Sequence, residues 1–217
     1  MELILENGVG AAKVEPSRTA VLAVHWQVDA VKADGAFGPI FARTVEEAGV
    51  IPRTARVLEA ARAAGSPAIY VNVCFWPGHT DLVRNNALFN TVWEKKGFVR
   101  GTRGVEVIPE LAPRAGDYVI EHSRISAFHG NDILMILRAR GIETVAVTGV
   151  ATNVAIDHTV RDAAQLGFNT VLLEDCCCSS SPAYQEAALM SLRVIATKVV
   201  DASRFRAALG GAAGGTV

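Results

Sequence analysis

The sequence lacks a charge excess of either sign, long apolar runs, and enough cysteine for a disulfide framework. Its formal net charge of −1 argues against nucleic acid or an anionic membrane as a partner. No apolar run approaches the ~18 residues that a membrane span needs, and the N-terminus has no basic segment followed by an apolar one, so no signal peptide is expected. The four cysteines, three of them adjacent at 176–178, predict free thiols and a cytoplasmic location.

The sequence has enough apolar residues to form one complete hydrophobic core. The chain has 217 residues, of which 50% are hydrophobic, and it shows no internal repeat or domain boundary, so a single domain over 1–217 is expected. The segment 76–116 is expected to be an irregular insertion with a functional or interface role. The residues 210–217, GGAAGGTV, are expected to form a flexible tail.

Short apolar runs alternate with segments that have helix start and stop signals. Strands are predicted over 19–25, 67–75, 117–122, 144–150, 169–175 and 194–200. Helices are predicted from about Pro52 to Gly65, from Asn131 to Gly141, from Thr152 or Asn153 to Gly167, and from Pro182 to about Leu192. Strands separated by helices predict an α/β fold, a doubly wound parallel sheet with helices on both faces.

Three segments at predicted strand ends are the candidate site. In a doubly wound sheet, ligands bind beyond the carboxyl ends of the strands, near the reversal of strand order. The segments that follow the first, third and fourth strands are HWQVD at 25–29, HSRISAF at 122–128 and VATNVA at 150–155.

Together these segments resemble the isochorismatase-like cysteine hydrolases. Members of that family typically carry Asp-x-Gln-x-Asp, then a Lys shortly before Ser-Ala-Phe, then Gly-Val-x-Thr-x-x-Cys after the corresponding strands. The resemblance covers roughly residues 18–205. It implies a three-layer, six-stranded parallel sheet of order 3-2-1-4-5-6, a homo-oligomer, and a cis peptide at Val150–Ala151. It also implies an oxyanion hole made by the N–H groups of Ala151 and Ala155.

All three catalytic positions of the family differ in this chain. His25 stands for the Asp, His122 for the Lys and Ala155 for the Cys, so no acyl-enzyme can form at that position. Two imidazoles with ordinary pKa values could serve as base and acid on a bound water, with Asp29 orienting His25. The sequence therefore predicts a small-molecule hydrolase or lyase that needs no cysteine and no cofactor. The alternative is a catalytically inactive family member that serves as a small-molecule binding protein or a regulatory protein.

Further residues are candidates for substrate contact. Arg124 is expected to bind an anionic group of the substrate. The remaining candidates for the pocket wall are Gln27, Trp26, Phe128, Trp76 and His79.

Several structural alternatives stay open. His25 could be a hydrogen-bonded core histidine, Gln27 could have a structural role, and Asp29 could pair with Arg124. No metal is expected, because His25, His122 and Asp29 lack a close-spaced ligand motif. Cysteines 176–178 have no basic neighbour in sequence that would activate a thiol, which disfavours them as a replacement nucleophile.

Overall fold

The fold is built on a six-stranded parallel sheet. The computed structural model describes residues 13–210 and 215–216. The sheet has the order β4-β3-β2-β5-β6-β7, which is the predicted order 3-2-1-4-5-6 and confirms that expectation. Its strands are β2 (Thr19–Val24), β3 (Ala68–Val73), β4 (Tyr118–His122), β5 (Thr144–Val150), β6 (Asn169–Cys178) and β7 (Lys198–Val200).

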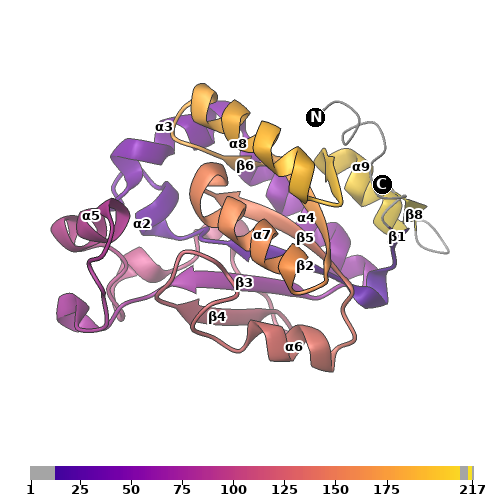
Figure 1. The fold of residues 1–217 in the computed structure, drawn as a ribbon, viewed down its shortest axis with the longest axis horizontal. Helices are drawn as coiled ribbons and strands as arrows, with labels where there is room; N and C mark the ends of the chain where they lie inside the picture. The colour runs from indigo at the N-terminus through magenta and orange to yellow at the C-terminus, as the bar shows by residue number, and fades with distance from the viewer. Residues whose placement is uncertain (1–12, 211–214, 217) are drawn as a thin grey trace.

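Helices cover both faces of this sheet and give the three layers (Figure 1). One core cluster lies under α2 (Val28–Val31), α3 (Gly38–Ala48), α4 (Val50–Ala64), α5 (Ala87–Lys95) and α9 (Ala202–Gly210). The other lies under α6 (Ile133–Ala139), α7 (Asp157–Gln165) and α8 (Pro182–Ile195). Every residue of β2, β3 and β5 is buried, as expected for parallel strands covered on both sides. None of the described helices is long and apolar enough to span a bilayer.

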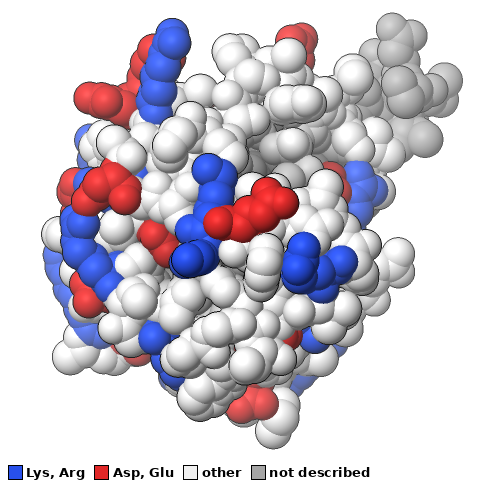
Figure 2. Space-filling view, turned by 90° about the vertical axis from the view of Figure 1, so that its left-hand side faces the viewer, with Lys and Arg blue, Asp and Glu red and all other residues white. Residues whose placement is uncertain are grey.

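Short 3₁₀ turns and one π-helical turn complete the described elements. The 3₁₀ turns are η1 (Pro16–Arg18), η2 (Pro77–His79), η3 (Arg103–Val105) and η4 (Pro109–Leu111), and the π-helical turn is η5 (Thr152–Ile156). Positive and negative side chains alternate over the face drawn in Figure 2, which carries no single-sign patch.

Several predicted boundaries were wrong. Helix α8 extends to Ile195, and its last hydrogen bond runs from Ala196 N to Leu192 O. The helix therefore includes the first two residues of the run expected as the sixth strand. Strand β6 continues through Cys178, which places all three adjacent cysteines within a strand rather than after it. Helix α4 begins at Val50, two residues before Pro52. Helix α6 follows Asp132 as N-cap, one residue after the expected Asn131.

Two expectations about irregular segments also need correction. The segment 76–116 is not wholly irregular, since it contains α5 and three 3₁₀ turns. Within the tail expected to be flexible, Gly215–Thr216 form β8, which pairs antiparallel with β1 (Lys13–Val14). Residues 211–214 and 217 of that tail lie outside the described residues. Helices α3 and α9 were not predicted.

Asn86 fixes the start of α5. Its Oδ1 accepts a hydrogen bond of 2.9 Å from Phe89 N, which satisfies one of the free N–H groups of the first turn. Asn86→Ala is expected to lower the free energy of unfolding by about 1 kcal/mol, measured by chemical denaturation. Asn85→Ala is the matched control because its side chain caps no helix. Equal losses in both variants would contradict the capping role.

Candidate active site

The carboxyl edge of the sheet brings the two predicted histidines into contact. His25 directly follows β2 and His122 ends β4. The Nε2 atoms of the two rings lie 2.8 Å apart, and both side chains are buried. His25 has a φ of 58°, a conformation that non-glycine residues seldom adopt. It redirects the chain where β2 ends.

The turn after β5 provides the backbone side of the same site. The Val150–Ala151 peptide is cis, as the resemblance implied, and η5 follows it. The N–H of Ala151 donates no hydrogen bond within the described residues. Ala155 is 3% exposed, and its methyl group occupies the place where the resemblance puts a nucleophilic thiol.

An apolar cavity with a volume of about 80 Å³ opens beside these groups. His25 and Arg124 are the only lining residues with polar side chains. His122 does not line the cavity, so its only route to a ligand there is through His25. The apolar wall consists of Ala30, Phe37, Phe41, Val73, Phe75, Leu88, Phe89, Val92, Phe98, Ile125, Val150, Ala151, Val154 and Ala155.

Burial keeps both imidazoles neutral. Desolvation lowers the pKa of His25 well below 6.5, and charge repulsion from His122 lowers it further. A hydrogen bond to the backbone of Val150 partly opposes this shift. Desolvation likewise lowers the pKa of His122 to about 4, against a raising effect of the backbone of His129 and Ser126. The expectation of ordinary pKa values near neutrality was therefore wrong. At pH 7 the pair is uncharged, and each ring can accept a proton.

Asp29 does not orient His25. Its Oδ1 accepts a hydrogen bond of 3.0 Å from Ala36 N and its Oδ2 one of 2.6 Å from Phe98 N. No ion pair joins it to Arg124 within the described chain, so both earlier roles for Asp29 were wrong. The residue lies on α2, whose turn directs the carboxylate toward two loops instead of the imidazole.

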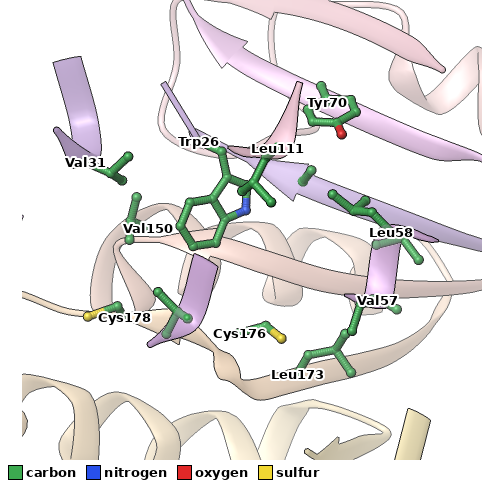
Figure 3. Close-up of a cluster of buried hydrophobic side chains, with 14 of the residues drawn as sticks. Trp26, Val31, Val57, Leu58, Tyr70, Leu111, Val150, Leu173, Cys176 and Cys178 are labelled. Atoms are coloured by element: carbon green, nitrogen blue, oxygen red, sulfur yellow. The ribbon is translucent and has the colours of Figure 1, made fainter. Parts of the chain in front are cut away.

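Trp26 and Gln27 belong to the core and not to a substrate site. Both are fully buried. Trp26 Nε1 donates to Thr148 Oγ1 at 3.2 Å, and Figure 3 places its indole among the core side chains. Gln27 Nε2 donates to the carbonyls of Val73 and Val105, while its Oε1 accepts from Val73 N. With these bonds made, Gln27 has a structural role and the expected substrate contacts of both residues were wrong.

Three more expected substrate contacts lie away from the cavity. Trp76 is 55% exposed on the surface. The Nε2 of His79 lies 2.8 Å from the carbonyl oxygen of Gly97, so this buried ring is tied to the backbone. Phe128 stacks on Phe168 with ring centroids 6.0 Å apart. None of the three lines the cavity, so the structure gives their expected substrate contacts no support.

The cysteines are not equipped to replace the missing nucleophile. All four are free and buried. Burial raises the pKa of Cys74 to about 11 and that of Cys176 to about 12, and it also raises the pKa of Cys177 and Cys178. These groups are thiols at neutral pH, whereas the thiolate is the nucleophile. Among residues 13–210 and 215–216, no three His, Cys, Asp or Glu side chains group to hold a metal ion.

Alkylation tests this description of the cysteines. Native protein treated with iodoacetamide at pH 7.5 is expected to keep its full ligand binding or turnover and to gain no adduct within an hour, because the thiols are buried and protonated. Mass spectrometry measures the adducts. Protein denatured before treatment is the control and should take up four equivalents, one for each cysteine. Rapid labelling of native protein with loss of function would contradict it.

The most informative site residues that sequence reasoning missed are aromatic. Five of the eight phenylalanines of the chain line the cavity, namely Phe37, Phe41, Phe75, Phe89 and Phe98. They come from α3, α5 and three loops, so no single motif contains them. Their one sequence signal is that all five fall within residues 37–98.

Comparisons with known proteins agree with this geometry. The isochorismatase domain profile matches residues 19–204. Ureidoacrylate amidohydrolase RutB of Agrobacterium fabrum is 33% identical over 175 residues, which cover 75% of this chain and 76% of that protein.

Solved structures of hydrolases share the fold. A cysteine hydrolase from Pseudomonas syringae pv. phaseolicola superposes with a TM-score of 0.81 at 25% identity, covering 93% of this chain and 98% of that one. N-carbamoylsarcosine amidase from Thermoplasma acidophilum superposes with a TM-score of 0.69 at 25% identity, covering 85% and 96%. With the profile matching most of its length, the chain belongs to the isochorismatase family of small-molecule hydrolases.

Proposed function

We propose that the protein hydrolyses an amide-type C–N bond of a small molecule by direct attack of water, with no covalent enzyme intermediate. One observation carries the proposal: a neutral, buried His25–His122 pair meets an apolar cavity through His25, while a methyl group stands where the family resemblance puts the nucleophile. A neutral imidazole is a competent general base, and general base catalysis contributes typically 10²- to 10⁴-fold to a rate.

The 2.8 Å contact between the rings defines the proton path. One imidazole must donate and the other accept. In the productive tautomer His25 Nε2–H donates to His122, which leaves the lone pair of His25 on Nδ1. A water attacks the carbonyl carbon as His25 Nδ1 takes its proton, and the Nε2 proton passes to His122. The N–H groups of Ala151 and Ala155 then stabilise the oxyanion.

Collapse of the tetrahedral intermediate completes the reaction. The protons move back across the pair, and His25 Nδ1–H protonates the leaving nitrogen as the C–N bond breaks. The products are a carboxylic acid and an amine, and the histidines regain their starting state. Arg124 has no carboxylate partner within the described residues, so it is free to bind an anionic group of the substrate at the cavity mouth.

Turnover of a substrate panel tests the proposal. Amides, ureido acids, hydrazides and vinyl ethers are incubated with the enzyme, and products are identified by mass spectrometry. The same reactions are quenched before one turnover, and the protein mass is measured. Amide turnover with no mass adduct supports direct water attack. A covalent adduct during turnover overturns it.

One observation favours a second candidate, a small-molecule binding protein without catalysis. The cavity wall is apolar apart from His25 and Arg124, and the chain offers no thiolate there. Binding of a panel member without turnover of any would establish this second function in place of the first.

We also propose a cellular location and an oligomeric state for the protein. A reducing, cytoplasmic environment is supported by four free cysteines. A homo-oligomer is supported by large apolar side chains that are exposed in the single chain, including Trp93, Met135, Tyr184 and Met190. Light scattering of the purified protein tests the oligomer, and a monomer mass would contradict it.

A further inference from the structure

The cavity wall is an aromatic box and not merely an apolar surface. Phe37 and Phe98 are stacked with centroids 5.4 Å apart and an interplanar angle of 30°. Phe75 and Phe89 meet edge to face, with centroids 6.4 Å apart and an angle of 83°. All four rings line the cavity together with Phe41.

The chemistry of this wall selects one kind of ligand. A polar group placed among these rings would lose its hydrogen bonds to water without regaining them, which is costly. An aromatic ring loses little on leaving water and gains face and edge contacts with the wall. His25 and the N–H of Ala151, at the edge of this wall, therefore suit the carbonyl end of a ligand.

Asp29 holds two sides of this wall in place. Its Oδ2 accepts a hydrogen bond from Phe98 N at 2.6 Å, and its Oδ1 accepts one from Ala36 N at 3.0 Å. Its carbonyl oxygen accepts a third, from Phe37 N at 2.7 Å. The stacked pair is thus fixed by one residue before any ligand enters, which lowers the ordering cost of binding.

We propose that the cavity binds an aromatic ring, so that the substrate is an aryl-bearing carbonyl compound with its carbonyl toward His25 and Ala151. Asp29 is a positioning residue for Phe37 and Phe98. That this ligand is a substrate rests on the proposed function, whereas binding of its aromatic ring does not depend on any reaction.

Calorimetry with two neutral probes tests the proposal. The probes are 3-phenylpropanamide and 3-ureidopropanamide, which share a primary amide and a two-carbon spacer and differ in the end group. The phenyl compound is expected to bind at least about tenfold more tightly, a factor that corresponds to a typical aromatic contact energy. Equal affinities, tighter binding of the ureido compound, or binding of neither would overturn the proposal.

Matched variants separate the wall from general stability. Phe37→Ala is expected to weaken binding of the phenyl probe about tenfold. Phe168→Ala is the control, since both rings are 4% exposed and Phe168 does not line the cavity. Unchanged binding in a folded Phe37→Ala, or equal weakening in both variants, would overturn the assignment.

For Asp29 the decisive readout is selectivity. Asp29→Asn replaces one of two acceptor oxygens by a donor, so the stacked pair should loosen and the ratio of the two probe affinities should fall at least threefold. A change in stability with an unaltered ratio would make Asp29 merely structural and overturn the positioning role.

Turnover keeps this proposal distinct from the hydrolase proposal. If the phenyl probe binds selectively but no panel compound is hydrolysed, the aromatic site stands and the proposed reaction fails. If only small polar amides are hydrolysed and the phenyl probe does not bind, the reaction stands and the aromatic site fails.

Discussion

His25→Ala is expected to lower kcat/KM for the best amide of the panel by at least about 100-fold, the lower range for loss of a general base. His25 is the one titratable side chain that lines the cavity apart from Arg124, so no neighbouring group can replace it there. Steady-state kinetics at pH 7 measure the loss, with thermal unfolding as a check that the variant folds.

His158→Ala is the control for that experiment. His158 is exposed on α7, and its removal should change kcat/KM by less than a factor of two. A His25→Ala enzyme that retains wild-type turnover would show that the reaction uses other groups, and it would remove His25 from the mechanism.

Acidification is expected to destabilise the fold by about 3 kcal/mol between pH 7 and pH 4 through His122 alone. Burial lowers its pKa from 6.5 to about 4, so between these values the unfolded chain binds a proton that the folded chain does not. The resulting stability is fully present above pH 6.5 and is lost as the pH falls toward 4. The lowered pKa of His25 acts in the same direction.

Chemical denaturation at several pH values measures this effect. His122→Gln should be less stable at pH 7 but should lose less stability on acidification than the wild type. His158→Gln, at an exposed position, should follow the wild-type slope. A wild-type stability that does not change between pH 7 and pH 4 would contradict the buried, neutral state of the histidine pair.

The sequence predicted the sheet well because its signal is local and strong. Runs such as 19–24 and 144–150 are largely apolar, with threonine as their only polar residue type, and a parallel sheet covered by helices buries such runs on both faces. The start of β7 was harder to predict, because Val194 and Ile195 have high strand propensity and yet extend α8, whose start is fixed by the Ser181 cap. Tertiary packing decides between such competing preferences.

The sequence predicted part of the site, and the wrong predictions share one cause. Strand ends placed His25 and His122 at the same edge, but spacing could not give the direction of the side chains that follow. The left-handed backbone at His25 ends the regular alternation of side chains between the two faces of β2. Trp26 and Gln27 therefore point into the core, and the carboxylate of Asp29 accepts hydrogen bonds from two loops. The pKa values of the two histidines depend on burial, and the aromatic wall depends on convergence of distant segments; neither can be read from a motif.

The pH dependence of kcat/KM tests the cysteine-free mechanism most directly, using the best amide of the panel from pH 4 to pH 10 with stability monitored at each pH. A neutral imidazole with a lowered pKa predicts a plateau from pH 6 to pH 8 and a decline only as the pH falls toward 4. A rate that instead rises steadily above pH 8 would indicate a thiolate nucleophile, since burial raises the pKa of the thiols to about 11 for Cys74 and about 12 for Cys176, and would contradict the account.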